Sequence, residues 1–259
     1  MKCVFCKENS DNSKSIEHII PESLGNKNAV LAKGIVCDSC NNYFGGKIEK
    51  DLLGSPFYKS LRSRYGIESK KGKIPLNVGY LPITGSEIEV DFNGIPEQNS
   101  RTLNVNIPKK SDFHKILNGE INELYIPVSF DLEKSKIVSR FLAKVGIEVV
   151  AQKYWDSERD VSYLITEELF DPIRNYARYG KGVELWDYHQ RRIYEETEEA
   201  KSLQKIYEFN IWSTEDNDNA LGLHLTIVLY GLEFTINLFE PSINRYQKWL
   251  RENDNKIPI

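Results

Sequence analysis

The sequence predicts an α+β protein in which a small cysteine-bearing module precedes a larger body. Three observations support this prediction. All four cysteines lie within the first 40 of the 259 residues. Residues 74–130 alternate apolar and polar side chains between Gly, Pro and Asn breaks, which is typical of antiparallel strands. Residues 137–150 repeat apolar side chains at helical spacing, which predicts a core helix for the body.

The cysteines form two C-x-x-C pairs, Cys3 with Cys6 and Cys37 with Cys40, and 30 residues separate the pairs. Each pair places two thiolates on one tight turn, and two such turns supply the four ligands of a tetrahedral zinc ion. The alternatives are disulfides, which need an oxidising compartment, and a redox pair, which needs a βαβ context that the sequence lacks. We expect structural zinc, because four thiolates leave no position open for catalysis.

The zinc ion should contribute most of the stability of this short module, which has few large apolar side chains. Between the cysteine pairs, Ile16, Ile19 and Ile20 surround a polar Glu-His pair, and this pattern predicts a short strand that ends at Pro21. From Ser39 onward the apolar side chains follow helical spacing. The predicted order is therefore turn, strand, long loop, turn and helix.

These motifs together resemble the HNH endonucleases, also called the ββα-metal or His-Me finger family, in the subgroup with a four-cysteine zinc site. The acid-His pair followed by Ile-x-Pro is matched by residues 17–21. The loop with Gly and Asn is matched by residues 25–28, and the C-x-x-C followed by Asn is matched by residues 37–41. The resemblance covers residues 3 to about 53.

The resemblance implies a role for four residues. His18 resembles the general base that takes a proton from the attacking water, and Asn28 would orient that imidazole. Glu17 and Asn41 resemble the two protein ligands of a catalytic cation. Here Glu replaces the commoner Asp, and Asn replaces His at the third signature position. Both changes provide oxygen ligands, which favour Mg²⁺ or Mn²⁺ over a second zinc ion.

The chemistry of phosphodiester hydrolysis needs these residue types. A cation can stabilise the leaving oxygen, and histidine is neutral often enough at cellular pH to accept a proton from water. Strand alternation points Glu17 and His18 to opposite faces, so they share a site only if the strand is twisted or bulged. Each residue also has a structural interpretation: His18 as a loop imidazole, Asn28 as a turn former, Asn41 as a helix cap, and Glu17 as the partner of a nearby lysine.

We divide the chain into the module at residues 1–54, a basic linker at 55–73 and an α+β body of unknown role at 74–259. Gly54-Ser55-Pro56 is interpreted as a helix stop. Strands are predicted at 81–83, 88–92, 103–107, 124–130 and 206–212, with a hairpin of 221–229 and 232–239 joined across Tyr230-Gly231. A second helix is predicted at 167–179, ended by Gly180. On it, Arg174, Arg178 and Lys181 form either a phosphate-contacting row or a solvated basic face, and His224 is expected to be a packed or surface residue.

Charge is distributed unevenly along the chain. The net charge is -4, but residues 1–75 contain 13 Lys or Arg against 8 Asp or Glu. Only residues 1–75 have the excess of positive charge that favours binding of a polyanion such as nucleic acid. No apolar run approaches the ~20 residues that span a bilayer, and the first residues lack a secretory profile, so we expect a cytoplasmic protein without a membrane partner.

The function predicted from these patterns is that of a metal-dependent endonuclease acting on DNA, with double-stranded DNA as the expected partner. A role in bacterial restriction or antiviral defence is suggested by analogy alone. A homodimer and an activating ligand or partner protein are further expectations. The alternative is a non-catalytic zinc module that binds nucleic acid or protein.

Overall fold

The computed structural model describes residues 1–69, 71–91, 104–127, 134–194, 207–215 and 221–259. The fold is mixed α+β with antiparallel sheets, as the sequence predicted. Its contacts form two compact units. The first unit comprises Met1–Pro21, Gly25–Leu52 and Glu133–Ile259, and the second comprises Glu22–Leu24 and Leu53–Leu132. The cysteine module thus shares a unit with the C-terminal half of the chain. Our division into a module at 1–54, a linker at 55–73 and a body at 74–259 stays a prediction.

In the first unit, a helix follows the second cysteine pair. It begins as α1 (Asp38–Tyr43), continues as the π-helical segment η2 (Phe44–Glu49) and passes into α2 (Lys50–Gly54). Within the π-helical segment the Lys50 N–H donates to the Gly45 carbonyl, five residues back. The wider turn changes the direction of the side chains that follow, so the four-residue spacing of a regular helix does not hold across it.

A four-stranded antiparallel sheet forms the centre of the first unit, in the order β4-β7-β6-β5. Tyr230 and Gly231 both have positive φ, 52° and 75°, which suits the two-residue turn of a tight hairpin and confirms the predicted one. The sequence did not predict β4, because its side chains are polar. The strands are β4 (Tyr188–Arg192), β5 (Tyr207–Glu215), β6 (Leu221–Leu229) and β7 (Leu232–Asn237).

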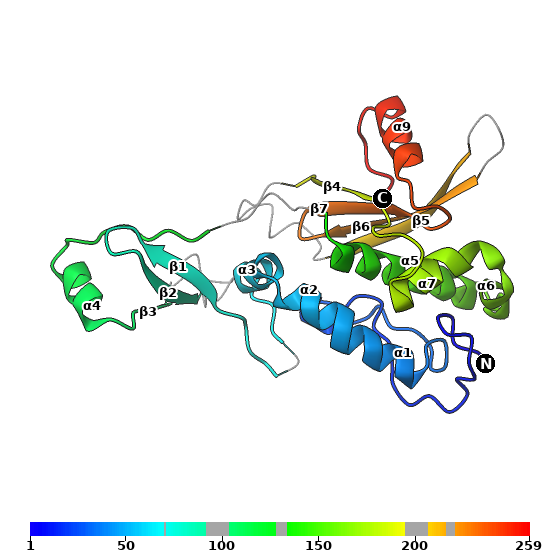
Figure 1. Ribbon diagram of the computed structural model, residues 1–259, viewed down its shortest axis with the longest axis horizontal. Coiled ribbons are helices and arrows are strands. Elements are labelled where there is room, and N and C mark those ends of the chain that lie inside the picture. Colours follow the sequence, from blue (N-terminus) through cyan, green and yellow to red (C-terminus); the bar gives the residue numbers. More distant parts are fainter. Residues whose placement is uncertain (70, 92–103, 128–133, 195–206, 216–220) are drawn as a thin grey trace. The chain divides into compact units, whose positions relative to one another are not determined.

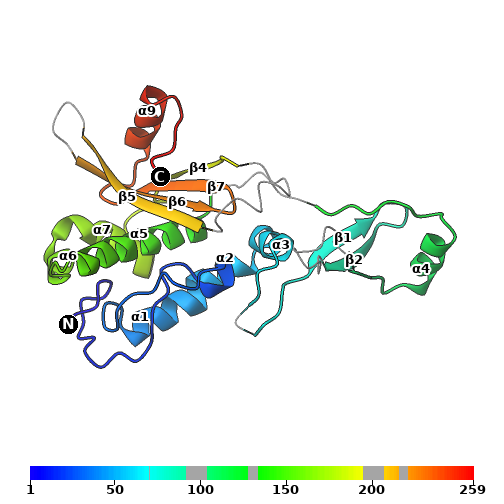
Figure 2. The same cartoon turned by 180° about the vertical axis from the view of Figure 1, so that it is seen from behind.

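Helices cover both faces of this sheet. Helix α5 lies along one face and α9 on the opposite one (Figures 1 and 2). Position 146 of α5 favours glycine, because a Cβ there would overlap the side chain of Leu238, which lies just beyond β7. The predicted core helix lies within α5, and the predicted second helix is η3 and α7, ended by Gly180 in the left-handed conformation at φ 65°. The helices are α5 (Lys136–Asp156), α6 (Ser162–Thr166), η3 (Glu168–Phe170), α7 (Asp171–Tyr179) and α9 (Asn244–Glu252).

The second unit contains a three-stranded antiparallel sheet, β1-β2-β3, whose apolar face packs around Leu81, Ile88, Val90 and Ile121. Of the predicted strand at 124–130, Tyr125 pairs with Tyr80, and residues 128–130 lie outside the described residues. The elements are η1 (Glu22–Leu24), α3 (Pro56–Arg64), β1 (Asn77–Leu81), β2 (Ser86–Asp91), β3 (Asn104–Asn106) and α4 (Lys110–Leu117).

Helix α3 occupies part of the stretch that the sequence predicted to be a linker. The Ser55 hydroxyl accepts a hydrogen bond from the Tyr58 N–H at 3.5 Å, and Pro56 follows at the first helical position. Phe57 and Leu61 are buried. The Ser-Pro pair therefore starts a helix as well as ending one, because a serine cap and a proline at the first position both favour a helix start.

Among the described residues, no helix is both long enough and apolar enough to cross a membrane.

Candidate functional site

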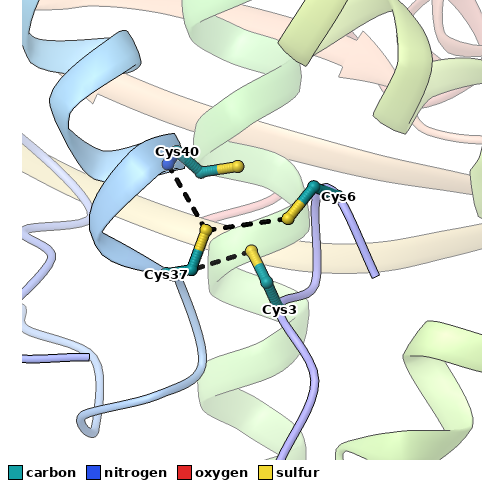
Figure 3. A group of neighbouring side chains, drawn as sticks. All are labelled: Cys3, Cys6, Cys37 and Cys40. Atoms are coloured by element: carbon teal, nitrogen blue, oxygen red, sulfur yellow. Dashed lines mark hydrogen bonds between the residues drawn. The ribbon is translucent and has the colours of Figure 1, made fainter. Parts of the chain in front are cut away.

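The four cysteines converge on one point (Figure 3). Cys3 and Cys6 lie on an N-terminal turn closed by the Lys7 N–H donating to the Cys3 carbonyl at 2.9 Å. Cys37 caps α1, and Cys40 lies in its first turn. Their sulfur atoms all lie within 4.8 Å of one another, and those of Cys6 and Cys37 are 3.6 Å apart. Zinc–sulfur bonds of ~2.3 Å in a tetrahedron place sulfurs ~3.8 Å apart, so the cluster fits one zinc ion.

The surroundings of the cysteine cluster also suit a bound cation. Burial raises the pKa of the Cys6 thiol to about 11, so a thiolate there needs a positive partner. From helix α7, Arg178 Nε donates to Cys40 Sγ at 3.3 Å, and the Cys37 N–H donates to Cys3 Sγ at 3.3 Å. Such hydrogen bonds orient thiolate ligands and spread their charge.

Helix α7 also holds the first cysteine turn through Arg174. This side chain is buried, and it donates from Nε to the Val4 carbonyl and from Nη2 to the Leu164 carbonyl, both at 2.6 Å. It also contacts Asp171, which in turn pairs with Lys7 at 2.6 Å. The predicted basic row is therefore wrong for Arg174, whose guanidinium is neither solvated nor exposed to a phosphate.

His18 lies on a short antiparallel bridge with Val30. The Ile19 N–H donates to the Ala29 carbonyl at 3.0 Å, and the Leu31 N–H donates to the Glu17 carbonyl at 2.9 Å. Along this strand Glu17 is buried at 5% exposure, whereas His18 is half-buried. The acid therefore lies inside and the imidazole toward the surface. The two groups are nevertheless close enough for His18 to exert a coulombic effect that lowers the pKa of Glu17, against the larger effect of burial.

The loop between the two bridge strands is held by Asn26, a residue that the sequence analysis did not single out. Its buried amide donates to the carbonyls of Ile20 at 2.6 Å and Ala29 at 2.9 Å. Its oxygen accepts from the Asn28 N–H at 2.9 Å, the Ala29 N–H at 2.8 Å and the Tyr207 hydroxyl at 2.8 Å. Asn28 itself has an exposed side chain and contributes its backbone to this network. The contacts that hold this loop are thus made by the side chain of Asn26, and the role of Asn28 in orienting the imidazole stays a prediction.

Asn41 connects helix α1 with the strand that contains Glu17 and His18. Its half-buried amide nitrogen donates to the Ile16 carbonyl at 3.2 Å. Cys37 caps the helix instead, so Asn41 is not the cap that its position near the helix start allowed. The structure therefore brings Asn41 beside the residue that precedes Glu17, and the hydrogen bond leaves the amide oxygen of Asn41 for another partner.

Glu17 pairs with Lys144, which lies on helix α5 and is fully buried. The ammonium lies 2.6 Å from Glu17 Oε1, 3.0 Å from Glu49 Oε1 and 3.0 Å from Glu148 Oε2. It also donates to the His18 carbonyl at 3.1 Å. The lysine partner that the sequence analysis allowed for Glu17 is present, but it comes from a helix 127 positions further along the chain.

This cluster contains three carboxylates and one ammonium, and it has little access to water. Burial raises the pKa of Glu17 and raises the pKa of Glu148, although the ammonium opposes both shifts. Two effects act on the pKa of Lys144. Burial alone would lower this pKa, but the three nearby carboxylates raise it by more, so the pKa is well above its usual value and the amine stays charged. Glu17 Oε2 and Glu148 Oε1 are buried without a hydrogen-bond partner. With all groups ionised, two negative charges remain unbalanced.

His224, which was expected to be either a packed or a surface residue, is packed. It is fully buried on β6, and its Nε2 lies 3.0 Å from the Thr214 hydroxyl. Burial lowers its pKa to about 4.

Comparison with known proteins supports the motif analysis for the N-terminal segment. Residues 3–56 match the family model described as HNH endonuclease. No curated protein matches the chain. No solved structure matches it either. The match spans both cysteine pairs, His18, Asn28 and the helix that follows them. The family resemblance predicted from the sequence is therefore confirmed: residues 3–56 of this chain match the HNH endonucleases.

Proposed function

We propose that this protein is a metal-dependent endonuclease that hydrolyses phosphodiester bonds in DNA. The observation that supports this most is the half-buried His18 on the strand that Asn41 connects to helix α1, within a segment that contains the four-cysteine cluster and matches the HNH endonucleases. Because His18 is accessible while its backbone is held by the bridge to Val30, the imidazole is suited to accept a proton from a water molecule at the surface.

Glu17 and Asn41 would hold the catalytic cation. Their donors suit Mg²⁺ or Mn²⁺, which prefer oxygen ligands. Glu17 Oε2 is buried without a hydrogen-bond partner, and the amide oxygen of Asn41 is not used in its bond to Ile16. A divalent cation would also favour the ionised form of Glu17, whose pKa is raised by burial. When bound, such an ion stabilises the charge that develops on the leaving oxygen.

The residues of this chain would divide the remaining work. His18 would take the proton from the attacking water, and Asn26 would keep the loop behind it in one conformation through its four backbone hydrogen bonds. The zinc ion would take no part in the chemistry, since four thiolates fill its coordination sphere. Its contribution would be to keep the strand and helix α1 in register.

We propose double-stranded DNA as the substrate because only residues 1–75 have an excess of positive charge. A cytoplasmic location, a homodimer that cuts both strands, an activating ligand or partner protein, and a role in restriction or antiviral defence are proposed by analogy alone.

One observation favours a different function. Glu17 is buried and paired with Lys144, and an acid in that state could be purely structural. The protein would then be a non-catalytic zinc module that binds nucleic acid or protein. The two functions differ in whether a divalent cation and His18 are required for strand cleavage.

Plasmid nicking separates these functions. The full chain is incubated with supercoiled plasmid and Mg²⁺ or Mn²⁺, and single-stranded DNA and RNA are tested in parallel. We expect nicking that His18→Ala abolishes and that does not occur when Mg²⁺ and Mn²⁺ are left out. His114→Ala is the matched control, because His114 is an exposed histidine on α4. Zinc content should equal one ion per chain in all variants. Binding of DNA without any cleavage would favour the non-catalytic module, whereas nicking by the His18 variant at the parent rate would refute the assignment of His18 as the general base.

A further inference from the structure

We propose that Lys144 is a positioning residue of the nuclease site, although it lies on helix α5, far outside the segment that matches the family. This inference rests on the proposed function, because it assigns a role to Lys144 in holding the cation ligand Glu17 and the general base His18. Its basis is a set of contacts within the first unit, each of which joins α5 to the strand or helix of the nuclease segment.

Lys144 contacts the catalytic strand at two successive residues. Its ammonium binds the side chain of Glu17 at 2.6 Å and the backbone carbonyl of His18 at 3.1 Å. The contact with the carboxylate restricts the side-chain rotamer of Glu17, and the contact with the carbonyl restricts the backbone at His18. A carboxylate and an imidazole must be held closely if both are to act on one phosphate, because small displacements cost large factors in rate.

The lysine itself has little freedom to move. It is fully buried in the middle of a 21-residue helix. Glu148, one turn later on the same helix, and Glu49 of η2 both lie 3.0 Å from its nitrogen. An ammonium has three N–H donors, fewer than the four oxygens that lie within 3.1 Å of it, so none of its donors lacks an acceptor. The ammonium therefore holds Glu17 and the His18 carbonyl at a fixed position, because Lys144 lies in the protein core and is not a flexible surface side chain.

The two oxygens of Glu17 differ in a way that suits this role. Oε1 is bound to Lys144, whereas Oε2 is buried without a partner. An apolar residue of similar length at position 144 would fill the same space and leave both oxygens without a partner. A buried carboxylate in that condition would turn toward water or toward any available donor. With Lys144 present, one oxygen is held and the other remains for the cation.

The test compares Lys144→Met with Lys153→Met, which removes an exposed lysine from the same helix. Nicking by the full chain is measured against Mn²⁺ concentration, so that the concentration at half-maximal rate is separated from the maximal rate. Binding of Mn²⁺ is measured independently by electron paramagnetic resonance in a His18→Ala background. We expect Lys144→Met to raise the half-maximal Mn²⁺ concentration and the dissociation constant about tenfold or more. Lys153→Met should change neither, and zinc content should stay at one ion per chain.

A lysine that only stabilises the fold would lower the melting temperature without changing the Mn²⁺ dependence, and that result would overturn the proposal. A lower Mn²⁺ requirement in Lys144→Met would also overturn it, because Lys144 would then compete with the cation. Should Lys144→Met fail to fold, Lys144→Met with Glu148→Leu is measured instead. It leaves fewer unpaired carboxylates and has the same expected outcome.

Failure of the proposed function gives a different result. A parent chain that neither nicks nor binds Mn²⁺ would refute the nuclease assignment and this inference together. Nicking that requires His18 but is unaffected by Lys144→Met would refute only the role of Lys144.

Discussion

Arg174→Met tests whether helix α7 is needed to hold the first cysteine turn. In the structure this buried guanidinium donates to the carbonyls of Val4 and Leu164, each at 2.6 Å. Val4 lies between the two cysteines of the first pair, so these bonds connect the zinc cluster to α6 and α7. Methionine has a similar length and an apolar side chain, so the substitution removes the hydrogen bonds while it retains most of the packing.

The size of the effect follows from the bonds that are lost. A hydrogen bond to a charged donor contributes roughly 1.5–3 kcal/mol, and two buried carbonyls would lose their partner. Asp171 would keep Lys7 as an ion-pair partner, which limits the loss. Since such contributions are not additive, we expect the free energy of unfolding to fall by about 3–5 kcal/mol. We also expect faster release of zinc, because the Cys3–Cys6 turn loses its attachment.

The assay is equilibrium unfolding in urea with zinc bound, together with the rate of zinc transfer to a chromogenic chelator. Arg159→Met is the matched control, because Arg159 is exposed and its loss should change stability by less than about 0.5 kcal/mol. A loss below about 1 kcal/mol for Arg174→Met, with unchanged zinc release, would refute the reasoning that these buried bonds hold the turn.

Three further predictions concern the zinc cluster, the loop and the sheet. Removal of zinc by a chelator should expose residues 1–40 to limited proteolysis while the sheet stays protected, and equal protection without zinc would contradict this. Asn26→Ala should lower the free energy of unfolding by about 2–4 kcal/mol, against less than about 0.5 kcal/mol for the exposed Asn28→Ala, as measured by thermal denaturation. Burial lowers the pKa of His224 from 6.5 to about 4, so the unfolded chain binds this proton more readily than the folded one. Stability should therefore be complete above pH 6.5 and fall as the pH drops toward 4, by about 2 kcal/mol at pH 5; His224→Gln should flatten that slope in urea titrations, and an unchanged slope would refute it.

Several features of the fold could be predicted from the sequence because neighbouring residues encode them. The two C-x-x-C pairs predicted the cluster, since each turn presents its own two sulfurs whatever the rest of the chain does. Tyr230-Gly231 predicted the hairpin of β6 and β7, and Gly180 predicted the end of α7. In each case the local pattern predicts both the type of element and the residue at which it begins or ends.

Other elements were missed because their local signals are ambiguous. The Gly54-Ser55-Pro56 sequence was interpreted as a stop, but the Ser-Pro part also begins α3. In strand β4 only polar side chains follow the buried Tyr188, and the strand is recognised only through its pairing with β7. Asn26 resembles any loop asparagine until the loop closes around it and buries it.

The sequence by itself determined the family motif, the four-cysteine cluster and most of the strands and helices of the body. Only the tertiary structure decided the environment of the candidate site: that Glu17 faces a buried ammonium, that Lys144 also binds the His18 carbonyl, and that Arg174 holds the first cysteine turn. The physical reason is that sequence patterns report local backbone geometry and burial. The partner of a buried charge depends instead on which distant helix packs against it, and no local pattern around Glu17 specifies residue 144.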